Sequence, residues 1–277
     1  MKPAVLAQRL APLMPVMRCP RCRSAFALNG ASLVCQNRHT YDLSRRGYVN
    51  LAPSHDQNAE KYDAVLFDSR RLVFEHGFYL PVAEAIASAL PHGPVTVLDA
   101  GCGEGYYTRL LAERFPQAQF IGLDISRDAV TAAAREQSPA SWMVADLKHL
   151  PFADDCADVL LDVLTPANYD EFRRILSPDG LLIKVYPGSG YLRELRTARG
   201  LAPYEEGQVD AYLREKAAIM VETRVTVTHT ISDELWRDFV WMTPLMQDLS
   251  AEEKNAVAAK NAGSVTIDLH VAACRLT

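Results

Sequence analysis

The stretch CPRCRSAFALNGASLVCQNRH, residues 19–39, places three cysteines and one histidine within a short length of chain. The first two cysteines form a CPRC turn, and the other two ligands follow a hairpin whose predicted tip is Asn29-Gly30. Such a turn directs two thiolates to one point, and the hairpin returns a third thiolate and an imidazole there. The pattern predicts a closed, tetrahedral and therefore structural zinc site. The predicted ligands are Cys19, Cys22, Cys35 and His39.

Two alternatives to a metal site are a redox-active C-x-x-C pair and a coincidental grouping of cysteines. Zinc is favoured because the segment contains few apolar residues, and a module this small is rarely stabilised by its core alone. Metal binding contributes roughly 10–16 kcal/mol in small zinc modules, which would make up the deficit.

The same segment is basic although the chain as a whole is acidic. Between Arg18 and Arg46 lie six arginines and one acid, Asp42, whereas the full chain carries a net charge of −5. A basic module on an acidic body indicates a local surface for an anionic partner, and a solvated face is the alternative interpretation. The arginines expected to contact this anionic partner are Arg18, Arg21, Arg23, Arg45 and Arg46.

Nothing in the sequence predicts a membrane span or a secretory signal. No run of eighteen apolar residues occurs, and the apolar part of the N-terminus is short and broken by Pro12 and Pro15. We therefore expect a cytoplasmic protein, in which clustered cysteines favour metal binding over disulfides.

Downstream of the cysteines, predicted strands and helices alternate. Apolar runs at 95–101, 119–124, 141–146, 157–165 and 180–187 predict five buried strands, and amphipathic stretches lie between them. This order predicts an α/β fold with a doubly wound, mainly parallel sheet, which binds ligands beyond the carboxyl ends of its strands.

Acidic residues and a glycine loop lie at those strand ends. Asp99 precedes the glycines of LDAGCGEGYY, Asp124 ends the second strand, and Asp146 ends the third. One carboxylate can bind the two hydroxyls of a ribose, and the next can accept from an adenine amino group. A single nucleoside is thus predicted to lie across three strand ends. The positions expected to contact it are Asp99, Gly101, Gly103, Gly105, Asp124, Asp146 and the backbone amide of Leu147.

These motifs resemble those of the class I S-adenosylmethionine-dependent methyltransferases over roughly residues 95–190. The whole chain resembles the RlmA/RrmA family of 23S ribosomal RNA guanine-N1 methyltransferases. The resemblance is carried by CPRC, CQNRHTYDLSRRGYVNL, SRRLVFEHGFYLP, LDAGCGEGYYT, GLDIS, LPFADD and PGSGYLREL. It implies a class I Rossmann-like methyltransferase sheet behind an N-terminal Cys3His zinc ribbon, with S-adenosylmethionine and structural zinc as cofactors.

The resemblance also implies further site residues and partners. Cofactor contacts are expected at Tyr79, Gly103, Glu104 and Tyr191, although the residues taken without the resemblance favour ordinary core or rim packing for both tyrosines. The expected substrate is a guanine in a 23S ribosomal RNA hairpin, whose phosphates the five ribbon arginines named above would contact. The expected assembly is a homodimer. Of the two subtypes in the family, the sequence is closer to the one linked to macrolide resistance.

Guanine N1 carries a proton that must leave around methyl transfer, so a nearby carboxylate would help. The segment LDVLTPANYDEF begins within the end of the fourth strand and continues into the loop after it, where this fold presents its substrate-facing residues. Asp162 and Asp170 are candidate bases, Asn168 could hold the guanine edge, and the base stays unassigned between them.

The expected organisation is a zinc-ribbon RNA-recognition module at 1–50, a linker and helical segment at 51–94, and the methyltransferase domain at 95–277. Residues 45–65 resemble a polar linker. Two late strands, ETRVTVTHTI and SVTIDLHVAACRL, are expected to complete the sheet as edge strands. The aromatic helix between them, with Trp236, Phe239 and Trp241, is expected to pack in the core or a lid.

Two other functions compete with this hypothesis. A small-molecule methyltransferase would explain the large domain but would leave the arginine-rich ribbon without a role. In a non-catalytic binding protein the ribbon would bind a partner and the large domain would have lost its activity. The intact set of strand-end acids and loop glycines disfavours this alternative.

Overall fold

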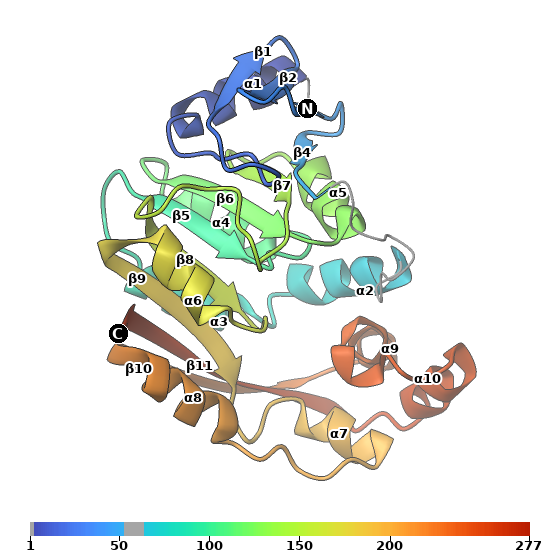
Figure 1. Ribbon diagram of the computed structural model, residues 1–277. Coiled ribbons are helices and arrows are strands. Elements are labelled where there is room, and N and C mark those ends of the chain that lie inside the picture. The colour runs from blue at the N-terminus through green and yellow to red at the C-terminus, as the bar shows by residue number, and fades with distance from the viewer. Residues whose placement is uncertain (1–2, 53–63) are drawn as a thin grey trace. The chain divides into compact units, whose positions relative to one another are not determined.

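The computed structural model describes residues 3–52 and 64–277, and the chain forms two compact units (Figure 1). Unit 1 spans Met1–Glu60, Leu90–Ile183 and Cys274–Leu276, and unit 2 spans Lys61–Ala89, Lys184–Ala273 and Thr277. The division into 1–50, 51–94 and 95–277 stays a prediction. The zinc-ribbon residues and the glycine loop thus belong to one unit.

The ribbon in unit 1 is a three-stranded antiparallel sheet that follows helix α1 (Pro3–Leu10) and the short 3-10 helix η1 (Ala11–Leu13). Its strands are β1 (Phe26–Asn29), β2 (Ser32–Cys35) and β3 (Thr40–Asp42). Asn29 pairs with Ser32, so the turn residues are Gly30 and Ala31, one position later than expected. This register sets Leu28 opposite Leu33 and thereby pairs the apolar residues of the two strands.

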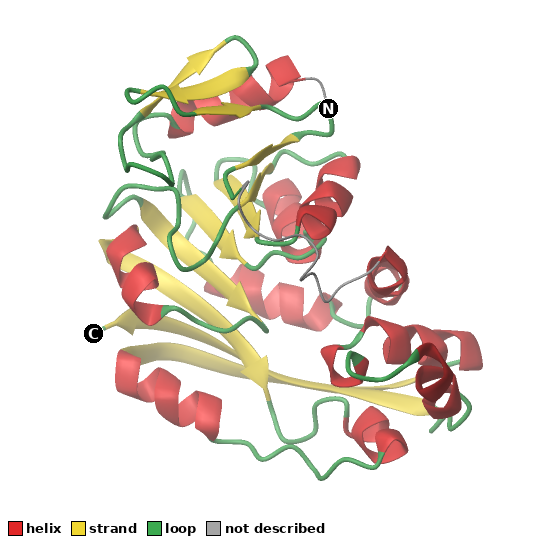
Figure 2. Cartoon of the chain, turned by 45° about the vertical axis from the view of Figure 1, so that its right-hand side comes forward, coloured by secondary structure: helices red, strands yellow, loops and turns green. Residues whose placement is uncertain are grey.

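The larger sheet of unit 1 confirms the doubly wound α/β prediction. Its strands run in the order β9-β8-β5-β6-β7-β4, and the pairs β8–β5, β5–β6, β6–β7 and β7–β4 are parallel. The strands are β4 (Tyr48–Asn50), β5 (Thr96–Ala100), β6 (Gln119–Asp124), β7 (Ser141–Val144), β8 (Ala157–Val163) and β9 (Leu176–Pro187), of which Leu176–Ile183 lies in unit 1. Helices α4 (Tyr106–Arg114) and α5 (Arg127–Arg135) pack against β6. Figure 2 shows helices and strands in separate colours.

Two segments of unit 1 differ from expectation. Helix α6 (Tyr169–Ile175) ends before Pro178, where the sequence predicts its end, and β9 begins at Leu176. A proline disfavours helical backbone at the residue that precedes it, so the helix stops earlier. In the predicted linker at 45–65, Tyr48–Asn50 form β4 beside β7, since the buried side chains of Tyr48 and Val49 belong to a packed strand. Residues 53–63 of that linker lie outside the described part of the chain.

Unit 2 contains the late strands and the remaining helices. Strands β10 (Ala217–Thr230) and β11 (Ser264–Leu276) confirm the two predicted strands, although Cys274–Leu276 of β11 belongs to unit 1. Of these two strands, β10 lies at an edge of the sheet and β11 does not, because the order is β10-β11-β9. Trp236 and Phe239 on the aromatic helix are fully buried, and the Phe239 ring lies 5.0 Å from that of Phe78, which confirms core packing for these two residues. The helices are α2 (Ala64–Glu75), α3 (Leu80–Ala89), α7 (Arg193–Arg199), α8 (Gln208–Lys216), α9 (Asp233–Met242), η3 (Pro244–Met246) and α10 (Ala251–Ala258).

Within residues 3–52 and 64–277, no helix combines the length and apolar character that crossing a bilayer requires.

Candidate zinc centre and cofactor site

The four predicted zinc ligands converge in the ribbon. One ligand atom from each of Cys19, Cys22, Cys35 and His39 lies within 4.8 Å of all the others. The sulfurs of Cys22 and Cys35 are 3.7 Å apart, and Nδ1 of His39 lies 3.5 Å from the sulfurs of both Cys19 and Cys35. A zinc tetrahedron with ordinary bond lengths has S–S edges of about 3.8 Å and S–N edges of about 3.6 Å. The spacing fits zinc, with Nδ1 as the ligating nitrogen.

The surroundings of the four ligands are suited to thiolates. The Tyr41 hydroxyl lies 3.7 Å from the Cys19 sulfur, and the Ser24 hydroxyl lies 3.1 Å from that of Cys22. Hydrogen bonds from Ser24 lower the pKa of Cys22 to about 5, whereas burial raises the pKa of Cys19. Because Cys22 is ionised at neutral pH, it offers a ready first ligand to the metal.

The glycine loop between β5 and α4 is held close to β6 and β7. The backbone amides of Gly101 and Cys102 donate to the carbonyl of Leu123, at 2.7 and 3.0 Å. Gly105 adopts a φ of +77°, and a Cβ there would lie 2.3 Å from the ring of Trp142. The loop needs glycine here because both the backbone conformation and the space exclude a side chain.

Asp124 joins the end of β6 to the glycine loop. Its carboxylate accepts from the amides of Gly103 and Ser126, each at 2.9 Å. The Ser126 hydroxyl in turn accepts from the amide of Ala129 at 3.2 Å and caps α5. The carboxylate is thus fixed beside the loop glycines, where a ribose would be recognised by its two hydroxyls.

Asp99 is the most buried acid at these strand ends. Thr108, one turn into α4, donates a hydrogen bond to Oδ2, while Oδ1 is buried with no hydrogen-bond partner among the described residues. Burial is the largest cause that raises the pKa of Asp99 from 3.8 to about 7; the nearby charges of Asp124, Asp162 and Glu104 add to this rise, and the hydrogen bond from Thr108 opposes it. An unfilled buried acceptor among several acids fits a ligand that carries positive charge, as a sulfonium amino acid does.

The raised pKa of Asp99 predicts that the free energy of unfolding depends on pH in an unusual way. A carboxyl whose folded pKa is raised stabilises the protein most at low pH, and that contribution is lost as the pH rises toward 7. We expect the free energy of unfolding to fall by about 3 kcal/mol between pH 5 and pH 8, at about 1.4 kcal/mol per pKa unit. Urea unfolding of Asp99→Asn should show little of this decrease. If the variant retains the full decrease, another group titrates.

Asp146 and Leu147, the residues predicted to contact adenine, lie just after β7. The Asp146 carboxylate accepts from the amide of Lys148 at 2.9 Å, and the Leu147 carbonyl accepts from the Asn168 side chain at 3.2 Å. The loop after β7 is therefore tied to the start of α6.

The three candidates after β8 differ in environment. Asp162 is completely buried on β8. The Asn168 side chain caps α6 by accepting from Glu171 at 3.3 Å. Asp170 pairs with Arg173 at 3.3 Å and its side chain is 97% exposed. Asn168 thus fixes the loop, and either carboxylate stays a proposed proton acceptor.

Tyr79 and Tyr191 both belong to unit 2. Their hydroxyls lie 3.0 Å apart, and the Tyr79 ring also packs against Phe74 with centroids 4.9 Å apart. The structure brings the two tyrosines together, and their contact with the cofactor stays a prediction.

The five arginines predicted to contact RNA are not equivalent. Arg23 donates to the carbonyls of Leu150 at 2.9 Å and Phe152 at 2.8 Å. Arg18 donates to the carbonyls of Pro15 and Met17, at 2.8 and 2.9 Å. Both guanidinium groups therefore donate hydrogen bonds to backbone carbonyls of this chain. The remaining three are exposed; they are Arg21, Arg45 and Arg46.

Sequence reasoning did not anticipate the residues that support the site. Thr108 donates to Asp99, Trp142 packs against Gly105, and Thr165 lies 2.4 Å from the position of a Cβ on Gly101. The signal for Trp142 was a large aromatic on a strand beside a glycine loop, but no local pattern marks Thr108 or Thr165.

A glycine loop with acidic strand ends on a doubly wound sheet, behind a four-ligand zinc centre, defines a zinc-ribbon methyltransferase that uses S-adenosylmethionine. Comparison with known families agrees. Residues 17–60 match the N-terminal zinc ribbon of RlmA, and residues 97–180 match a methyltransferase domain.

Similarity to named proteins extends over nearly the whole chain. The Bacillus subtilis protein YxjB, whose name places it among the 23S rRNA (guanine-N1)-methyltransferases, is 34% identical over 92% of this chain and 95% of its own. The 23S rRNA (guanine(748)-N1)-methyltransferase of Streptomyces fradiae is 32% identical over 94% of this chain and 96% of its own. The chain belongs to the family of 23S rRNA (guanine-N1)-methyltransferases.

Proposed function

We propose that this protein transfers a methyl group from S-adenosylmethionine to N1 of a guanine in a hairpin loop of 23S ribosomal RNA. The observation that carries the proposal is that similarity to 23S rRNA (guanine-N1)-methyltransferases covers the ribbon and the sheet together. A small-molecule methyltransferase would need the sheet but not a ribbon with exposed arginines.

The chemistry sets limits on the substrate. N1 lies on the Watson–Crick edge of guanine, so the base must be unpaired or turned out of its stack. S-adenosylmethionine supplies an activated methyl group when bound. The protein mainly aligns the reacting atoms, an effect worth up to about 7–11 kcal/mol, and Asp162 or Asp170 would accept the N1 proton.

A direct test incubates the protein with labelled S-adenosylmethionine and either total ribosomal RNA or a metabolite extract. Label in 23S RNA is expected, at a position that stops reverse transcription because N1-methylguanine cannot pair. Label in small molecules, or no label in either fraction, would contradict the proposal.

The target would be the guanine named for the Streptomyces fradiae relative, guanine 748. Resemblance to the macrolide-linked subtype supports this assignment. Mapping of the methylated position tests it, and deletion of the gene should change macrolide susceptibility.

The RNA substrate also supports a cytoplasmic location. Family resemblance supports a homodimer, which light scattering of the purified protein would detect.

Binding of the RNA would depend on the basic ribbon. Reversing two exposed charges, Arg45→Glu with Arg46→Glu, is expected to weaken binding of the hairpin at least tenfold. It should also lower the slope of log affinity against log salt by about 1–2, because phosphate contacts are lost. Filter binding over a salt series measures both quantities.

The matched control is Arg114→Glu with Arg135→Glu, which makes the same charge change at the exposed ends of α4 and α5. Affinity for S-adenosylhomocysteine should be unchanged by the ribbon pair. Equal losses of RNA affinity in both double variants would mean that net charge, and not the ribbon, governs binding.

A further inference from the structure

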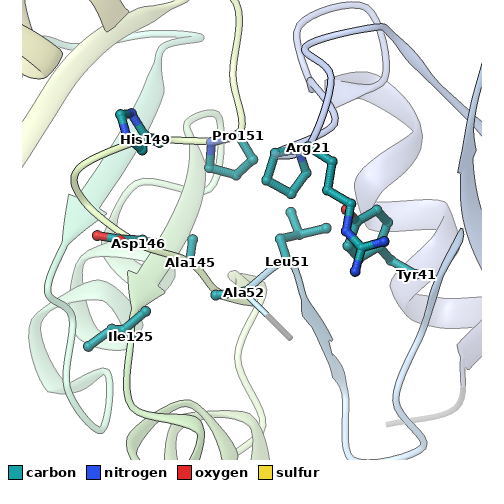
Figure 3. Close-up of a pocket in the computed structure, with 10 residues that line it drawn as sticks. Arg21, Tyr41, Leu51, Ala52, Ile125, Ala145, Asp146, His149 and Pro151 are labelled. Carbon is teal, nitrogen blue, oxygen red and sulfur yellow. The ribbon is translucent and has the colours of Figure 1, made fainter. Parts of the chain in front are cut away.

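A cavity of about 340 Å³ lies within unit 1 where the zinc ribbon meets the carboxyl ends of β4, β6 and β7 (Figure 3). Its volume falls in the range of ligand pockets, roughly 300–1,000 Å³. Ribbon residues and residues of the larger sheet contribute to the same lining. The lining residues are Pro20, Arg21, Tyr41, Leu51, Ala52, Ile125, Ala145, Asp146, His149 and Pro151.

The sheet side of this cavity carries residues at the predicted adenine end of the cofactor site. Ile125 directly follows Asp124, the ribose residue, and Asp146 is the carboxylate expected to accept from the adenine amino group. In Figure 3 Ile125 and Asp146 lie on one side of the cavity, and Arg21 and Tyr41 of the ribbon lie on the other. The cavity therefore shares Asp146 with the predicted nucleoside site and also includes the residue next to Asp124.

The two sides carry complementary chemistry for adenine. The amino group of adenine donates, and its ring nitrogens accept. Asp146 can accept from the amino group, while the Arg21 guanidinium can donate to a ring nitrogen. Apolar side chains such as Pro20, Leu51 and Ile125 suit the faces of the ring.

The ribbon is also bonded to the loop that carries Asp146. The Arg18 amide donates to the Pro151 carbonyl at 2.8 Å, and the Arg23 guanidinium donates to the carbonyls on either side of that residue. The turn between the zinc ligands Cys19 and Cys22 is closed by Arg23, whose amide donates to the Cys19 carbonyl at 2.8 Å. Zinc fixes this turn, and the turn fixes the loop.

We propose that the zinc ribbon forms one wall of the adenine pocket, with Arg21 as a contact to the base, so that zinc binding and cofactor binding are thermodynamically linked. The inference rests on the cofactor alone and not on which RNA is methylated. By reciprocity, whatever zinc contributes to cofactor affinity, the cofactor contributes to zinc affinity.

The first test replaces Arg21 with alanine and measures S-adenosylhomocysteine affinity by calorimetry without RNA. Loss of one charge-assisted hydrogen bond predicts an affinity about tenfold lower. The control is Arg45→Ala, which removes the same charge from an exposed ribbon position that does not line the cavity. Equal affinity in the two variants would overturn the proposal, as would a loss of hairpin RNA binding in Arg21→Ala with nucleoside affinity unchanged.

The second test uses the intact protein. Competition with a chromophoric chelator gives the zinc affinity with and without saturating S-adenosylhomocysteine. We expect the ligand to tighten zinc binding several-fold in the unaltered protein and less in Arg21→Ala. A zinc affinity that is the same with and without the ligand would show that the two sites are independent.

Discussion

Replacing Cys35 with serine is expected to abolish zinc binding at neutral pH and to unfold the ribbon. Cys35 is buried, and its sulfur lies 3.7 Å from that of Cys22 and 3.5 Å from Nδ1 of His39, so the site cannot close without it. Zinc supplies roughly 10–16 kcal/mol of apparent binding free energy to modules of this kind, far more than their small cores provide. The measurements are zinc content per chain and the free energy of unfolding, which should fall by more than about 3 kcal/mol.

The matched control is Cys156→Ser. This cysteine lies outside the zinc cluster and its sulfur donates to the Ala153 carbonyl at 3.0 Å, a hydrogen bond that a serine hydroxyl can keep. The control should therefore retain one zinc per chain and nearly the original stability. A Cys35→Ser protein that keeps a full zinc content would contradict the prediction, because the metal would then be bound without Cys35.

The ribbon shows which features of a site can be predicted from the sequence. Ligand type and spacing predicted all four zinc ligands, because a tetrahedral metal imposes a pattern of its own on the chain. The hairpin tip was displaced by one residue, because strand register depends on which side chains meet across the pair and not on the turn alone. Local chemistry was thus predictable, and pairing was not.

The same distinction applies to the arginines and to β4. A count of charges treats Arg21, Arg23 and Arg45 alike, but only the folded chain presents the carbonyls of Leu150 and Phe152 to Arg23. Likewise, Tyr48–Asn50 is too short to be recognised as a strand, and it becomes one because β7 offers a parallel edge. Strand-end acids were easier to find, since the carboxyl ends of parallel strands always meet at one edge of the sheet.

Replacing Gly105 with alanine is expected to cost about 2–5 kcal/mol and to prevent cofactor binding. Two effects add at this position. The left-handed backbone, with φ of +77°, costs a residue with a side chain about 1–2 kcal/mol, and overpacking typically costs a further 1–3 kcal/mol. The added Cβ would lie 2.3 Å from the Trp142 ring, which is fully buried and also closely underlies Gly122, so the ring has no space to move away.

Gly200 separates the two effects. It ends α7 with nearly the same φ, +81°, but a Cβ there would meet nothing within 4 Å. Gly200→Ala should therefore show the backbone cost alone, about 1–2 kcal/mol, and leave S-adenosylhomocysteine affinity unchanged. Urea unfolding and calorimetric titration of both variants measure the difference. Equal losses would mean that Trp142 yields and that backbone conformation alone selects glycine, whereas the expected excess at Gly105 identifies the indole as the support that holds the loop in shape for the nucleoside.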